Sequence, residues 1–174
     1  EDPGKGDMAR TNGPFIHDMS SYFLSVNRGK KSLSLNMRHE KAKEIVRDLL
    51  PETDLLVENF RPGIMKKMGL DYDTVKDMNP RLLYVSISGF GQYGPYSQRP
   101  AFDMIAQGMG GTVSITGEPG RAPVRVGYSI GDLGAALYAV AATMAALYER
   151  EKTGQGQHID VAMLDSQVAL CENA

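Results

Sequence analysis

The stretch Gly131-Asp132-Leu133-Gly134-Ala135-Ala136 opens a long run of small and apolar residues that ends at Leu147-Tyr148-Glu149-Arg150. A glycine-rich segment, Thr153-Gly154-Gln155-Gly156-Gln157, and a β-rich segment, His158-Ile159-Asp160-Val161-Ala162, follow it directly. This order predicts a buried helix over residues 132–151, a turn, and a strand over residues 157–162. The buried stripe of that helix is expected to contain Leu133, Leu137, Val140, Ala141, Met144 and Leu147. It also places a carboxylate, that of Asp132, at the mouth of an apolar helix, where it can do chemistry.

The rest of the chain alternates between strand-like and helical patterns. Pro51 and Gly69 are typical of positions just after a helix. We expect strands over 32–35, 54–60 and 82–88, and helices over 38–50, 62–67, 74–78, 102–109 and 164–170. Such alternation is typical of an α/β fold with a mostly parallel open sheet flanked by helices. The strand over 54–60 is largely apolar, which favours a central place in that sheet.

Composition limits the classes of partner. The 174 residues carry 19 Lys and Arg against 21 Asp and Glu, so no general attraction to nucleic acid or to an anionic membrane is expected. The single cysteine, Cys171, excludes a disulfide framework and a cysteine metal site within one chain, and it suits a reducing compartment. The longest apolar run, 133–148, is alanine-rich and ends in charge, so we expect a buried helix there and no membrane span.

Two further segments have both a plain and a functional interpretation. Val57-Glu58-Asn59-Phe60-Arg61-Pro62-Gly63 follows a strand; it is either an ordinary turn into a helix or part of a ligand site at the carboxyl edge of the sheet. The basic segment 27–32 is either a solvated turn or a phosphate site. The spacing of Gly89, Gly91 and Gly94 resembles a dinucleotide fingerprint, but Pro95 and Pro100 disfavour the helix that it requires, so we expect a mobile loop near the active site.

Taken together, the Gly131–Ala136 and Val57–Gly63 segments resemble the family III CoA-transferases, the group of formyl-CoA transferase and carnitine CoA-transferase. The resemblance covers nearly the whole chain and implies the Rossmann-like large domain of that family. It also implies an acyl-CoA:carboxylate CoA-transferase with acyl-CoA and a small carboxylate as substrates and no metal. Asp132 then matches the nucleophile, which forms a mixed anhydride and an aspartyl-CoA thioester. Without the resemblance, composition alone favours the simpler interpretation of Asp132 as an N-cap of its helix, and the resemblance reverses that preference.

The resemblance assigns the remaining site residues. Phe102 and Asp103 match substrate-side positions, where the formyl-CoA enzyme has tyrosine and glutamate. Arg38 and Lys67 keep a positive charge where the family has lysine and arginine. The residues that it places around coenzyme A are Leu35, Arg38, Asn59, Phe60, Arg61 and Lys67.

Two alternative functions stay open at this point. The α-methylacyl-CoA racemases share the fold but use a histidine at the position that matches Phe102, and phenylalanine cannot exchange a proton. The other alternative is a non-catalytic CoA-binding module. The three histidines, His17, His39 and His158, are scattered, so we expect them at the surface.

Both ends of the chain look cut, since it begins in a loop and stops inside a helical pattern at Cys171-Glu172-Asn173-Ala174. We therefore expect residues 1–174 to be a single incomplete domain, without the small domain and both chain ends. The resemblance further implies an interlocked homodimer when the protein is full length, and a cytoplasmic location is expected.

Overall fold

The computed structural model describes residues 1–172 and divides into two compact units, residues 1–46 and residues 47–174. Each unit is described by itself below. The last two residues of the expected C-terminal helical pattern, Asn173 and Ala174, lie outside the described residues. The expectation of a single incomplete domain stays a prediction.

The first unit contains a small hairpin. A 3-10 helix, Met8–Thr11, precedes the antiparallel strands β1, Phe15–Ile16, and β2, Met19–Ser20. Helix α1, Ser21–Asn27, begins where the Ser20 hydroxyl accepts a hydrogen bond from the Phe23 N–H at 3.0 Å. This side-chain cap satisfies one of the free donors of the first turn.

The strand expected over residues 32–35 is wrong. The segment pairs only with the first residue of the chain: the Glu1 amino group donates to the Leu33 carbonyl at 2.7 Å, and the Leu35 N–H donates to the Glu1 carbonyl at 3.1 Å. One partner residue cannot make a ladder, so the alternating pattern stays an irregular extended segment. Helix α2, Glu40–Leu49, then confirms the helix expected over 38–50.

The second unit is built on a parallel sheet in the order β3-β4-β5. The strands are β3, Leu55–Glu58, β4, Leu83–Ser88, and β5, His158–Ala162, with Val57 opposite Val85 and Val85 opposite Ile159. The central strand is β4, which is buried at all but one position. The central place predicted for the strand over 54–60 is therefore wrong within the described residues: β3 lies at an edge of this sheet, and Val57 is exposed.

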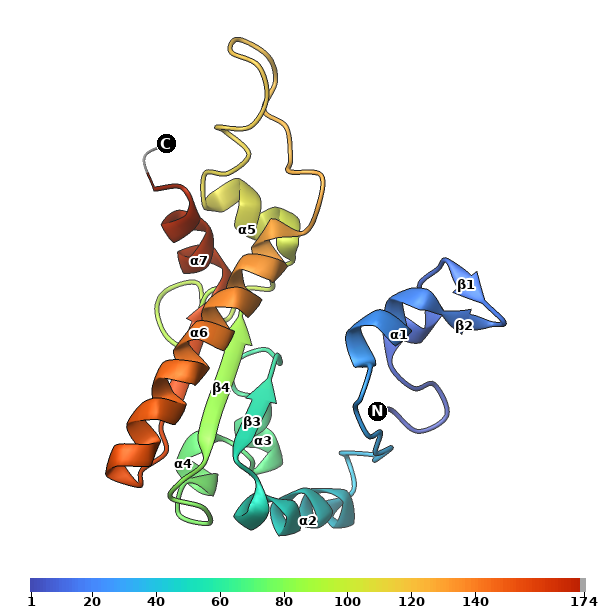
Figure 1. Cartoon of the computed structure of the whole chain (residues 1–174), viewed down its shortest axis with the longest axis vertical. Coiled ribbons are helices and arrows are strands. Elements are labelled where there is room, and N and C mark those ends of the chain that lie inside the picture. The colour runs from blue at the N-terminus through green and yellow to red at the C-terminus, as the bar shows by residue number, and fades with distance from the viewer. Residues whose placement is uncertain (173–174) are drawn as a thin grey trace. The chain divides into compact units, whose positions relative to one another are not determined.

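Helices flank this sheet, which confirms the predicted α/β class. The short helix α3, Ile64–Met68, ends at Gly69 in the left-handed conformation, and α4, Tyr72–Val75, follows. Helix α6, Ile130–Thr153, packs along β4 and β5, while α5, Asp103–Met109, and α7, Met163–Leu170, pack against α6. Figure 1 shows α5, α7 and the start of α6 beyond the carboxyl ends of β4 and β5.

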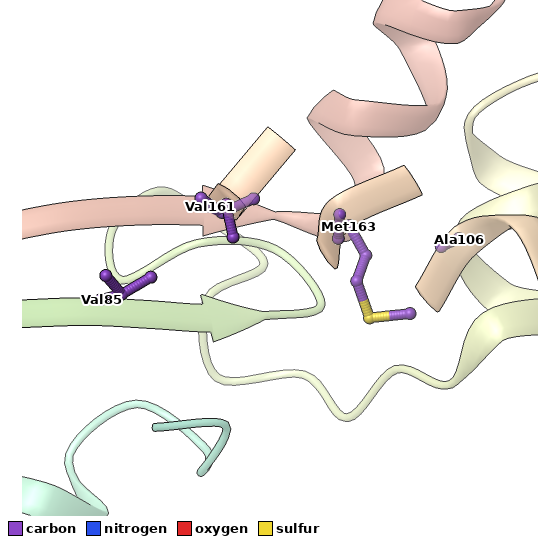
Figure 2. Close-up of a cluster of buried hydrophobic side chains, with 6 residues drawn as sticks. Val85, Ala106, Val161 and Met163 are labelled. Atoms are coloured by element: carbon purple, nitrogen blue, oxygen red, sulfur yellow. The ribbon is translucent and has the colours of Figure 1, made fainter. Parts of the chain in front are cut away.

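The core of this unit lies between the sheet and α6. Val85 and Val161 come from neighbouring strands and meet Ala135 and Ala139 of α6, with Ile87 and Ile159 packed against the cluster. Figure 2 shows Met163, at the start of α7, lying between Val161 and Ala106 of α5. The core therefore ties the three helices near the carboxyl ends of the strands to the sheet.

The orientation of α6 corrects one expectation. The predicted buried stripe included Leu133, Leu137, Val140, Ala141, Met144 and Leu147, but all of these except the half-buried Leu147 are exposed. The buried face carries small residues instead, among them Gly134, Ala135, Ala139 and Ala146, because small side chains let the helix lie close to the sheet. By length and composition alone, α6 is also long and apolar enough to cross a membrane, whereas the sequence analysis expected no membrane span over residues 133–148. The core helices of soluble proteins share this property.

Candidate active site

Asp132 lies in the first turn of α6, as its third residue. It does not cap the helix, because the N-cap position belongs to Ser129 and makes no side-chain cap bond. A carboxylate from another helix takes that role: the Gly131 N–H donates to Asp103 Oδ1 at 2.8 Å. Asp132 itself is exposed, so its carboxylate is open to a ligand.

The environment raises the pKa of Asp132 above its ordinary value of 3.8. Partial burial is the larger cause, since it removes water from the charged form, and the nearby Asp103 carboxylate adds like-charge repulsion. A position in the first turn of a helix acts in the opposite direction, because it favours the ionised form. A carboxylate that is poorly solvated when ionised is a stronger base and a better nucleophile.

Phe102 and Asp103, the two candidates for contact with the substrate, differ in their exposure and in their hydrogen bonds to the protein. Phe102 immediately precedes α5 and is 80% exposed. Asp103 is only 8% exposed and binds protein groups with both oxygens, the Gly131 N–H and the Gln107 side-chain amide. The structure thus brings Asp103 next to the residue preceding Asp132. A direct contact of Phe102 or Asp103 with substrate stays a prediction.

Most of the small residues around Asp132 pack against the protein. Gly131, Gly134 and Ala135 are buried, and a Cβ on Gly134 would lie 2.7 Å from Leu170 Cδ1 of α7. Their small size serves close packing of α6 against α5 and α7. Of this group, Ala136 is exposed.

The turn after β3 is held firmly at the carboxyl edge of the sheet. The Asn59 amide nitrogen donates to the Ile87 carbonyl on β4 at 2.7 Å, and the Phe60 N–H donates to the carboxylate of the buried Glu58 at 2.8 Å. Asn59, Phe60 and Arg61 are exposed, as is Lys67 on α3. This edge is where ligands bind in open α/β sheets.

Leu35 and Arg38 belong to the first unit. Leu35 is half-buried. Arg38 is exposed, and its backbone N–H donates to the Asn36 side-chain oxygen at 3.1 Å. Their contacts with coenzyme A stay predictions from the resemblance.

A pocket of about 310 Å³ lies just beyond the ends of β4 and β5, and the sequence did not predict its lining. The glycine- and tyrosine-rich loop over residues 89–99 covers this pocket. The Asp160 carboxylate accepts the Gln92 N–H at 2.8 Å and so fixes this loop to β5. None of the predicted site residues lines it. Its walls are formed by Phe90, Gly91, Tyr93, Gly94, Pro95, Tyr96, Asp160, Ala162, Leu164 and Asp165.

No cluster of metal-binding side chains was found within residues 1–172.

These features define a class: an α/β protein with a parallel sheet and an exposed carboxylate at a helix start beyond the strand ends. The sequence pattern of CoA-transferase family III matches residues 1–174, and the chain belongs to this family. An acetyl-CoA:oxalate CoA-transferase from Acetobacter aceti is 46% identical over 100% of the chain and 45% of the relative. A human succinyl-CoA:glutarate CoA-transferase is 45% identical over 97% of the chain and 39% of the relative.

A crystal structure of a CaiB/BaiF family protein from Brucella suis matches with a TM-score of 0.92 and 43% identity, over 98% of the chain and 46% of that structure. The chain spans about half the length of the curated relatives that it matches. The match confirms the predicted family and fold.

Proposed function

We propose that the whole protein is an acyl-CoA:carboxylate CoA-transferase with Asp132 as its nucleophile. Membership in CoA-transferase family III supports the class of reaction. The observation that carries the assignment of the residue is the exposed Asp132 carboxylate in the first turn of α6, with a pKa raised by partial burial and by Asp103.

The proposed reaction begins with attack of an Asp132 oxygen on the thioester carbonyl. The carbon–sulfur bond breaks, CoA leaves as a thiolate, and the acyl group is joined to Asp132 as a mixed anhydride. The thiolate then attacks the Asp132 carbonyl, which releases the donor acid and leaves an aspartyl-CoA thioester. The acceptor carboxylate attacks the Asp132 carbonyl of this thioester, expels the thiolate and forms a second mixed anhydride. The thiolate then attacks the acceptor's carbonyl in that anhydride. The carbon–oxygen bond to Asp132 breaks, which releases the new acyl-CoA and restores the Asp132 carboxylate.

We infer that coenzyme A is held at the end of β3 by Asn59, Phe60 and Arg61, with Lys67 on α3 attracting a phosphate. The support is their exposure at the carboxyl edge of the sheet together with the rigid backbone of the turn. Each charge-assisted phosphate contact is worth about 1.5–3 kcal/mol.

The resemblance also supports a homodimeric, cytoplasmic protein, and both properties are proposals. Large apolar side chains such as Leu137 and Val140 are exposed along α6, and such a surface is unfavourable in water. A partner subunit or further protein structure would bury it.

The test is a transfer assay on the whole protein, with a panel of acyl-CoA donors against mono- and dicarboxylic acids. Dicarboxylates come first, because oxalate and glutarate appear in the names of the two relatives. Asp132→Ala should reduce transfer to background. Glu149→Ala is the control, since Glu149 is an exposed acidic residue near the other end of the same helix, α6. Equal activity in both variants would refute Asp132 as the nucleophile.

A racemase alternative is separated by a second assay. Phe102 stands where a racemase needs its histidine, so a 2-methylacyl-CoA should keep an α-deuterium during incubation. Asp132-dependent washout of deuterium without any carboxylate acceptor would favour the racemase. A pure binding module would show neither activity in the unsubstituted protein.

A further inference from the structure

Two glutamine side chains next to the start of α6 are fully buried. Gln107 on α5 and Gln167 on α7 are each 0% exposed. Burying an amide without partners costs about 1–3 kcal/mol, so a buried glutamine must have its polar atoms satisfied. The reaction proposed above uses neither residue, which raises the question of what they hold.

Gln107 holds the chain that leads into α6. Its Nε2 donates to the Tyr128 carbonyl at 3.3 Å, and its Oε1 accepts the Val126 N–H at 3.0 Å. The same Nε2 donates to Asp103 Oδ2 at 2.8 Å, and the other oxygen of Asp103 accepts the Gly131 N–H. Through Gln107 and Asp103, α5 therefore fixes three backbone points just before Asp132.

Gln167 holds the first residue of α6 from the other side. Its Nε2 donates to the Ile130 carbonyl at 3.0 Å, and its Oε1 accepts the Thr112 hydroxyl at 2.8 Å. Thr112 and Ile130 stand at the two ends of the long connection between α5 and α6, which projects away from the helices in Figure 1. Gln167 thus joins both ends of this connection to α7.

Glycines make room for these contacts. A Cβ on Gly131 would lie 3.0 Å from both the backbone oxygen and Oδ1 of Asp103, and a Cβ on Gly110 would overlap the Cβ of Gln167. A side chain at position 131 would push Asp103 away from the start of α6, and one at position 110 would displace Gln167. The packing and the hydrogen bonds therefore define the same arrangement.

From these contacts we propose that Gln107 and Gln167 form an amide brace that positions Asp132 for attack on the acyl-CoA carbonyl. They are positioning residues, because they act on Asp132 through the backbone at 126–131. The proposal rests on the transferase function proposed above. A displacement of about 1 Å at a nucleophile can cost on the order of 100-fold in rate, so loss of the brace should act on the chemical step.

The test uses Gln107→Met and Gln167→Met in the whole protein, because methionine keeps the length of the side chain and removes its hydrogen bonds. We expect kcat per folded molecule to fall about 10- to 100-fold, with the KM for acyl-CoA changed by less than about threefold. Without substrate, amide hydrogen exchange should become faster over residues 126–133. Leu82→Ala is the control: Leu82 is buried just before β4, at the other end of that strand, so its loss should lower stability and leave kcat unchanged.

The outcomes separate the two proposals. An active unsubstituted protein whose two methionine variants keep their kcat would overturn the brace and leave the transferase function standing. A fall in kcat that Leu82→Ala reproduces at equal loss of stability would also overturn it. An unsubstituted protein without transfer activity, but with faster exchange over 126–133 in the variants, would refute the proposed function and the catalytic role of the brace. It would leave Gln107 and Gln167 with a structural role only.

Discussion

At the scale of single residues, the central feature is an aspartate whose surroundings oppose its charge. Asp132 lies close to Asp103, which is itself buried and anchored by the Gly131 N–H and Gln107. Repulsion and partial burial both act on the ionised form of Asp132, and both raise its pKa. A protein tolerates such a group when it is used in chemistry, so the electrostatics agree with a nucleophilic role.

The raised pKa has a consequence for stability. Keeping Asp132 ionised costs the folded state free energy above its folded-state pKa, and this cost disappears as the pH falls through that pKa toward the ordinary value of 3.8. Asp132→Asn should therefore raise the unfolding midpoint at pH 7, and the gain should vanish on acidification below about pH 4. Denaturant unfolding at a series of pH values measures this directly.

Asp165→Asn provides the matched control for that measurement. It removes the same charge from the same position of a helix, α7, and should give no gain at pH 7, because an acidic residue in a first turn is normally favourable. A lower midpoint for Asp132→Asn than for Asp165→Asn at pH 7 would contradict the electrostatic account.

Only part of this site could be predicted from residue types. The Asp132 position follows from the apolar helix and the resemblance, and the turn at Asn59 follows from the end of a strand. The burial of Gln107 and Gln167 could not be predicted from the sequence, because a single glutamine in a helical pattern usually lies at the surface. Their role depends on three segments far apart in sequence, and only the fold brings these segments together.

At the scale of elements, the junction at the end of α6 holds the sheet together. Arg150, in the last turn of α6, is 6% exposed and donates to the carbonyls of Asp54 and Arg81, each at 3.2 Å. It also pairs with the Asp54 carboxylate at 3.0 Å. One guanidinium thereby connects α6 to the segments that begin β3 and β4.

Arg150→Ala should lower the free energy of unfolding by about 2–4 kcal/mol, because it removes several charge-assisted hydrogen bonds from a buried position. Arg81→Ala is the control. The Arg81 side chain makes an ion pair with Glu151 at 3.4 Å with both partners exposed, and its loss should cost only about 0–1 kcal/mol. Equal losses in urea denaturation would show that the Arg150 contacts do not support the junction.

The elements were predictable where a local signal fixes an end. Pro51 and Gly69 mark the ends of α2 and α3 within a few residues. The segment over 32–35 failed, because alternation predicts a strand only if a partner strand is available. The buried face of α6 also failed: hydrophobicity favoured the leucines, whereas close packing against the sheet selected glycine and alanine.

At the scale of the whole molecule, the parallel sheet provides the scaffold of the second unit, and the candidate groups of that unit lie near its carboxyl edge. The turn after β3, the glycine- and tyrosine-rich loop after β4, and the start of α6 all follow this architecture. Family membership agrees with that arrangement over all 174 residues.

The measurement that tests the central claim most directly is covalent trapping on the whole protein. After incubation with an acyl-CoA that supports transfer, hydroxylamine or borohydride should convert the activated carboxylate into a stable adduct. Peptide mass spectrometry should find that adduct on Asp132, and only when acyl-CoA was present. An adduct on Asp103 or Asp165, or efficient transfer by Asp132→Ala, would contradict the account.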